Sequence, residues 1–148
     1  MSHFAQVKTQ IRNKECLVAA LTELSLKPTV HEEPVHLKGY YGDSQGYLAE
    51  IVVPGKCIHA RSDIGFRLND DQTYSSIYDS YETDPRLGSD FFSHKLVQAY
   101  GRQVVLAKIE QLKETHGECT IEESTHGTNT IMRLTFPVHQ QHVQHARR

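Results

Sequence analysis

The stretch SDIGFRLNDDQTYSSIYDSY, residues 62–81, constrains the fold more than any other part of the chain. Within it, Ile64, Phe66 and Leu68 alternate with polar residues and glycine, which is the period of a strand with one buried face. The segment NDDQ then supplies turn residues, and TYSSIYDSY follows as a second strand. Residues 62–81 are therefore predicted to form an antiparallel hairpin.

Two segments have the period of a helix instead. Residues 13–26 begin with Asn13, a good N-cap residue, and continue with an apolar stripe at helical spacing. Residues 91–113 are the longest helix candidate, with large apolar residues on one broad face. Between this helix and the hairpin, TDPRLGSD is expected to be a loop.

Further strands are predicted at residues 5–11, 29–42 and 46–55, and a second hairpin from GECTIEE and NTIMRLTF. The order is then β-α-β-β-β-β-α-β-β, with short turns between neighbouring strands. This order favours an α+β fold in which an antiparallel sheet of about six to seven strands carries two main helices on one face. We expect a single domain over 1–136 and a His-rich flexible tail over 137–148.

Composition narrows the class of protein. The chain has 148 residues and a formal net charge of −2, which argues against a dedicated nucleic-acid surface. Its three cysteines are far apart in sequence and suit a reducing compartment rather than a disulfide framework. No apolar run approaches the roughly 18 residues of a membrane span. A small soluble, cytoplasmic protein is expected.

Several short motifs occur in order along the chain: MSHF at the start, then HLKGYYG, DIGFR and FFSHKLVQAYGRQVV. By this ordered set of motifs, the chain resembles the uncharacterised ycf35-like family of cyanobacteria and algal plastids, whose members have a domain of unknown function of the DUF1257 type. It departs from the family's tryptophan-rich pattern, because it has no tryptophan. The resemblance implies a compact α+β fold, a cytoplasmic or stromal location, and an accessory role beside an AAA-type ring-forming ATPase or a larger assembly.

A polar ligand site is one hypothesis for the face of the hairpin opposite Ile64 and Phe66. Asp63 and Arg67 share that face, Gly65 leaves room between them, and Arg67 offers a fork of donors to an anion. Asp79 is a candidate companion acid, and the candidate tyrosines of such a cleft are Tyr40, Tyr78 and Tyr100. The alternative is a cross-strand ion pair or a solvated face, with Gly65 relieving crowding or marking a bulge.

A weaker candidate is a metal site of His139, His142 and His145, whose spacing of three places them on one side of a helix. The alternative is a polar terminus without a metal, and we expect no cofactor. Two functions remain in competition. One is a non-catalytic accessory module that binds an unidentified protein partner, and the other is a small-molecule or metal-binding enzyme or sensor around Asp63, Arg67 and Asp79.

Overall fold

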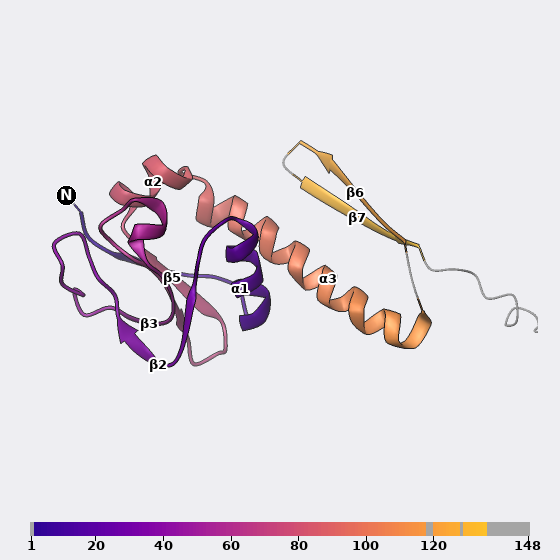
Figure 1. Ribbon diagram of the computed structural model, residues 1–148, viewed down its shortest axis with the longest axis horizontal. Coiled ribbons are helices and arrows are strands. Elements are labelled where there is room, and N and C mark those ends of the chain that lie inside the picture. Colours follow the sequence, from indigo (N-terminus) through magenta and orange to yellow (C-terminus); the bar gives the residue numbers. More distant parts are fainter. Residues whose placement is uncertain (1, 118–119, 128, 136–148) are drawn as a thin grey trace, which may run out of the picture. The chain divides into compact units, whose positions relative to one another are not determined.

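The computed structural model describes residues 2–117, 120–127 and 129–135, and it is drawn in Figure 1. The chain divides into two compact units, residues 1–104 and 105–148, which are described separately below. The predicted single domain over 1–136 stays a prediction, and the predicted tail over 137–148 lies outside the described residues.

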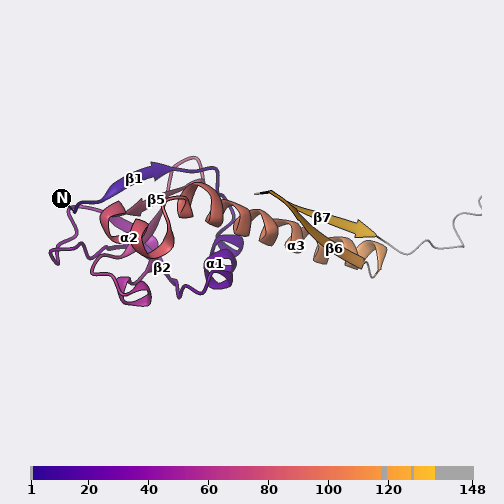
Figure 2. The same cartoon turned by 90° about the horizontal axis from the view of Figure 1, so that it is seen from above.

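The first unit is built on a five-stranded antiparallel sheet. Its strands are β1 (Ala5–Lys8), β2 (Thr29–His36), β3 (Leu48–Val53), β4 (Ile64–Leu68) and β5 (Tyr74–Tyr78), in the spatial order β1-β5-β4-β3-β2. The central hairpin is confirmed: β4 and β5 pair with Leu68 opposite Tyr74. β1 and β2 are the two edges, and Figure 2 shows β1 running beside β5.

Two helices pack on one face of this sheet. Helix α1 (Lys14–Glu23) begins at the predicted N-cap, because the Asn13 side chain accepts a hydrogen bond from the Cys16 amide. Helix α3 (Leu96–His116) starts in the first unit and continues into the second. Buried residues of both helices, among them Leu17 and Leu96, form one cluster with Phe66 of β4. The predicted α+β fold with two main helices on one face is confirmed.

The opposite face carries a smaller cluster of Phe4, Leu37, Ala49, Val52 and Ile77. Adjacent residues of a strand point to opposite faces, so Gly65 of β4 lies on this side while its neighbours lie in the main cluster. A Cβ atom at Gly65 would lie 2.7 Å from a methyl carbon of Leu37 and 2.8 Å from the Cβ of Ala49. Glycine here therefore relieves crowding, as one of the two alternatives predicted.

The segment after the hairpin is a helix and not the predicted loop. Helix α2 (Ser80–Leu87) begins where β5 ends, because the Asp79 carboxylate accepts a hydrogen bond from the Tyr81 amide at 3.0 Å. Glu82 lies in its first turn, where the helix dipole favours an acidic residue. Pro85 and Gly88 suggested a loop, but a short helix tolerates the proline and ends at the glycine.

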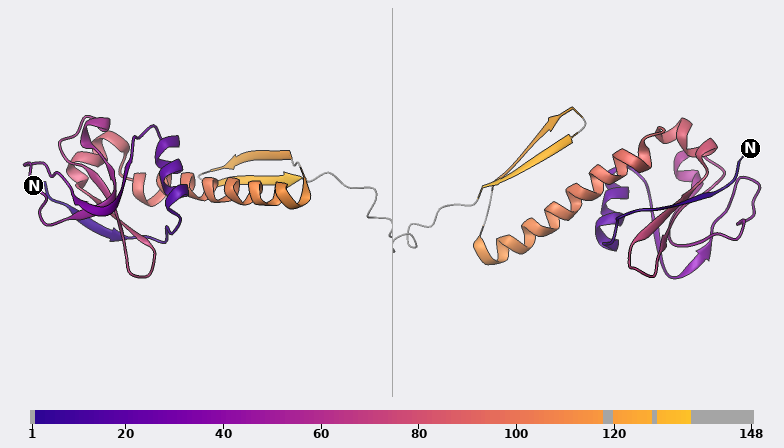
Figure 3. Two further views of the ribbon diagram at one scale, coloured as in Figure 1. Left: turned by 60° about the horizontal axis from the view of Figure 1, so that its bottom comes forward. Right: turned by 180° about the vertical axis from the view of Figure 1, so that it is seen from behind.

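Short irregular turns complete the first unit. A 3₁₀ turn η1 (Gly55–Ile58) follows β3, and a π-helical turn η2 (Phe91–Lys95) leads directly into α3. The second unit contains strands β6 (Thr120–His126) and β7 (Asn129–Thr135), which pair as the predicted second hairpin (Figure 3). The structure thus has seven strands in its described residues, divided into a five-stranded and a two-stranded sheet.

Candidate functional site

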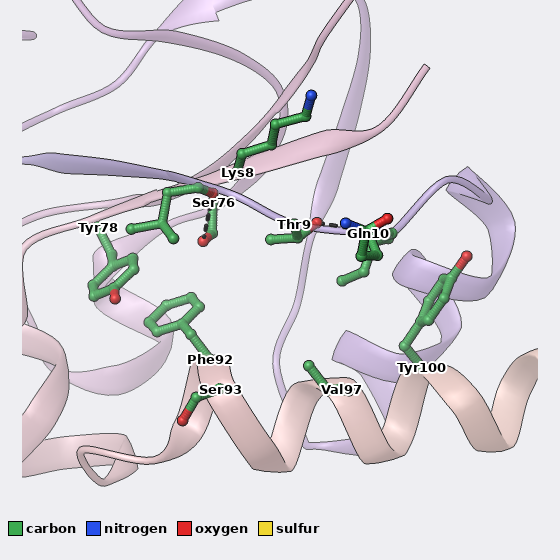
Figure 4. A pocket seen from close by; sticks show the side chains of 11 residues that line it. Lys8, Thr9, Gln10, Ser76, Tyr78, Phe92, Ser93, Val97 and Tyr100 are labelled. Atoms are coloured by element: carbon green, nitrogen blue, oxygen red, sulfur yellow. Dashed lines mark hydrogen bonds between the residues drawn. The ribbon is translucent and has the colours of Figure 1, made fainter. Parts of the chain in front are cut away.

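One candidate site is a groove of about 350 Å³ between the edge strand β1, strand β5 and the start of α3. We call it the apolar groove. Figure 4 shows Tyr78 and Phe92 at one end, Tyr100 at the other, and Val97 between them. Its lining residues are Val7, Lys8, Thr9, Gln10, Ile11, Ser76, Tyr78, Phe92, Ser93, Val97 and Tyr100.

Aromatic contacts fix both ends of the apolar groove. The rings of Tyr78 and Phe92 stack with their centroids 3.8 Å apart and their planes at 11°. At the other end, the Tyr100 hydroxyl accepts hydrogen bonds from the backbone amides of Arg12 and Asn13 at 3.1 and 3.0 Å. These contacts tie η2 to β5 at one end and α3 to the residues after β1 at the other, so the groove walls are held before any ligand binds.

The rim of the apolar groove exposes two valines. Val7 of β1 is 47% exposed and Val97 of α3 is 49% exposed. Beside them, Lys8 forms an ion pair with Asp71 at 2.6 Å, which ties β1 to the turn between β4 and β5. This ion pair and the Thr73 hydroxyl and amide hold the pKa of the Asp71 carboxyl well below its ordinary value.

A second cavity, of about 270 Å³, lies on the other face of the sheet. We call it the Arg67 cavity, after the arginine of β4 in its wall. The other lining residues are Gln6 of β1 and the consecutive Gly46, Tyr47 and Leu48. Arg67 Nη1 is buried and has no hydrogen-bond partner among the described residues.

The predicted polar residues have separate surroundings. Asp63 accepts hydrogen bonds from the backbone amides of Lys38 and Gly55 at 2.9 and 3.0 Å, so it joins the loop after β2 to the start of η1. Asp79 caps α2 with one carboxylate oxygen, while the other is buried without a partner among the described residues. Within the same residues, no hydrogen bond or ion pair links Asp63, Arg67 and Asp79. Ligand binding by these three stays a prediction.

The tyrosines are likewise divided between two places. Tyr78 and Tyr100 share the apolar groove, whereas Tyr40 lies in the loop after β2. The guanidinium carbon of Arg61 stands 4.9 Å from the centre of the Tyr40 ring, a cation–π contact. The structure therefore unites two of the three predicted tyrosines, but without the predicted acids and arginine.

No metal centre is formed by the residues that the structure describes, since they contain no group of three or more His, Cys, Asp and Glu able to hold an ion. The predicted site of His139, His142 and His145 falls outside those residues. Burial raises the pKa of the Cys16 thiol, and the nearby Glu15 raises it further. Cys16 is therefore a packing residue rather than a thiolate nucleophile. None of the described helices is long and apolar enough to cross a lipid bilayer.

Comparison with known proteins gives a family. The sequence model of a family described as "Protein of unknown function (DUF1257)" matches residues 20–135. The chain belongs to the DUF1257 family. Two similar relatives are proteins named "Uncharacterized protein ycf35", one from Cyanophora paradoxa and one from Guillardia theta. Each is 32% identical over 106 residues, which covers 72% of this chain and 77% of the relative. No solved structure gives a significant match.

The DUF1257 match includes most of both candidate sites but begins after β1. β1 is the strand that both sites share: Val7 lines the apolar groove and its neighbour Gln6 lines the Arg67 cavity. The sequence did not indicate Val7, Phe92 or Val97 as site residues, because an apolar residue at strand or helix spacing predicts burial in the hydrophobic core. The signal that separates them is an edge strand, which only the topology reveals.

Proposed function

We propose that this protein is a non-catalytic accessory module, and that it binds an extended segment of a partner protein along β1 with an apolar side chain in the apolar groove. The observation that carries the proposal is the pair of half-exposed valines beside the free edge of the sheet. Val7 and Val97 present carbon surface to solvent over a preformed groove, which is typical of an interaction site.

The edge strand supports the same occupant. β1 pairs with β5 on one side only, so its other edge has no strand partner among the described residues. Edge strands bind extended peptides by adding a strand, and pockets for alternate side chains then give specificity. The groove lies on the Val7 side of β1, where alternate side chains of an added strand would point.

A catalytic role has less support from the groove's chemistry. Its walls are mainly aliphatic and aromatic side chains, with hydroxyls and one lysine at the edge. The lysine is already paired with Asp71, and the Tyr100 hydroxyl already accepts two hydrogen bonds. We place this function in the cytoplasm or the plastid stroma, and the resemblance offers an AAA-type ATPase as one partner to test.

The test uses two valines with equal exposure at opposite edges of one sheet. Val7 of β1 and Val30 of β2 are both 47% exposed, so Val30→Asp is the matched control for Val7→Asp. Proteins captured from the native cells would be purified and tested as binary complexes by calorimetry. We expect Val7→Asp and Val97→Asp to weaken binding roughly tenfold or more, and Val30→Asp to leave it unchanged.

Hydrogen exchange on the complex then locates the partner. Protection is expected at the amides of residues 5–11 and 92–100, which border the apolar groove. A partner that binds the Val7→Asp and Val97→Asp variants as well as wild type contradicts the proposal. Self-association that Val7→Asp abolishes would also overturn it, because the occupant would then be a second copy of this chain.

A further inference from the structure

A second site, on the face of the sheet opposite the apolar groove, follows from the surroundings of Arg67. Arg67 lies in β4 on the face of the sheet away from the helices, in the wall of the Arg67 cavity. A guanidinium group carries its charge permanently, and its nitrogens lose hydration when they are buried. Nevertheless the Arg67 side chain makes no hydrogen bond or ion pair with any described residue, and its Nη1 atom is buried.

The residues beside Arg67 in the sheet direct their polar atoms elsewhere. Ser75, its partner across the β4–β5 pairing, donates its hydroxyl to the Asn69 side chain at 3.2 Å. On the other side of β4, Glu50 of β3 immediately precedes Ile51, which is paired with Phe66. The Glu50 carboxylate accepts a hydrogen bond from the Leu68 amide at 2.9 Å. The Ser75 hydroxyl and one oxygen of the Glu50 carboxylate are thus engaged by other groups, and the Arg67 side chain is left for a ligand from outside the chain.

The cavity in front of Arg67 has the size and the chemistry for that role. Its volume of about 270 Å³ equals roughly nine water molecules in the liquid, which fits a small metabolite better than a nucleotide. No acidic residue lines it, and the Gln6 amide adds a neutral polar group beside the charged arginine. Tyr47 is held in the wall by an edge-to-face contact with Phe4 at 5.6 Å.

We propose that the Arg67 cavity binds a small oxyanion, the carboxylate or phosphate group of a small molecule, through the guanidinium of Arg67. The planar fork of arginine matches two oxygens of either group, and a partly buried site strengthens each charged hydrogen bond. Gln6 donates a further hydrogen bond from β1, which β5 separates from β4. Asp63 and Asp79 take no part, because neither residue lines this cavity and both accept hydrogen bonds from backbone amides elsewhere.

The experiment measures thermal shift and calorimetric binding with inorganic phosphate and with succinate, each against sodium chloride of equal ionic strength. We expect at least one of the two anions to raise the melting temperature saturably and to bind at one site. If only phosphate binds, or only succinate, that result identifies which oxyanion the site prefers. Arg67→Gln should weaken that binding roughly tenfold or more, since the charged hydrogen bonds are lost.

Arg61→Gln is the matched control, because it removes an exposed arginine that contacts the Tyr40 ring instead. Binding that survives Arg67→Gln, or that Arg61→Gln removes equally, overturns the proposal. The proposal is also overturned if neither anion raises the melting temperature beyond the sodium chloride control.

A measurement on the unmodified protein covers the case in which Arg67→Gln fails to fold. Phenylglyoxal modifies arginines, and peptide mapping reports the rate at Arg67 separately from Arg61. We expect the bound oxyanion to slow modification at Arg67 and not at Arg61. Equal rates with and without the anion overturn the proposal. Neither result bears on the apolar groove, whose variants and readouts are different.

Discussion

Replacement of Gly65 by alanine tests how tightly the second face of the sheet is packed. A new Cβ atom would lie 2.7 and 2.8 Å from the two methyl carbons of Leu37, and 2.8 Å from the Cβ of Ala49. Ordinary carbon contacts are about 3.5–4.0 Å, so each neighbour must retreat by roughly 1 Å. The Leu37 side chain can rotate, but the Ala49 Cβ moves only if β3 moves with it.

The expected cost follows from these contacts. Overpacking of a buried site costs about 1–3 kcal/mol, and the stiffer unfolded chain of alanine returns about 0.4–1 kcal/mol. We therefore expect Gly65→Ala to lower the free energy of unfolding by about 1–2 kcal/mol. In a chain of this size the melting temperature should fall by roughly 3–8 °C.

Gly101→Ala is the matched control with the opposite expected sign. Gly101 is an exposed residue within α3, and no atom lies within 4 Å of a Cβ built there. Alanine should stabilise the helix by about 0.5–1 kcal/mol, because glycine is the poorer helix former. Both variants would be followed by urea unfolding and by calorimetry. If Gly65→Ala melts at or above the wild-type temperature, the close packing of Leu37 on β4 is refuted.

Three further predictions concern the border of the apolar groove and the main core. Tyr100→Phe removes an acceptor of two backbone amides and should cost about 1–2 kcal/mol in urea unfolding; an unchanged midpoint would refute the anchoring role of the hydroxyl. Because the folded pKa of Asp71 lies below its ordinary 3.8, its stabilisation is fully present above that pH and is lost as the pH falls further. The stability difference between wild type and Asp71→Asn should therefore shrink in acid, and a difference that is constant with pH contradicts the Lys8 ion pair. Iodoacetamide at pH 8 should alkylate partly exposed Cys57 before buried Cys16, as peptide mapping would report, and the reverse order would contradict the raised pKa of Cys16.

Local sequence signals predicted the elements of this fold well. The alternation of Ile64, Phe66 and Leu68 placed β4, and Asn13 placed the start of α1, because each signal acts within a few residues. The segment after β5 was predicted wrongly as a loop. Pro85 suggested a break in the chain. However, Asp79 caps the start of a helix six residues earlier, because a capping side chain acts on the free amides of the first turn alone.

The candidate site was harder to predict, because it depends on contacts between distant residues. Arg67 lies in β4 and Asp63 immediately precedes that strand, but Asp63 is engaged by the backbone amides of Lys38 and Gly55, which come earlier in the chain. The apolar groove joins residues near 7, 76 and 97, and no spacing rule connects them. Sequence reasoning located Tyr78 and Tyr100 individually but had no physical basis for pairing them.

The four residues of β1 form a wall shared by two cavities, with Val7 turned to one and Gln6 to the other. A segment this short, held at one edge by β5 and by the Lys8 ion pair, is the natural place for local opening of the sheet. If β1 detaches, both cavities lose a wall in the same event. Any ligand that holds β1 in place therefore raises the affinity for a ligand on the other face, and the two binding equilibria become thermodynamically linked.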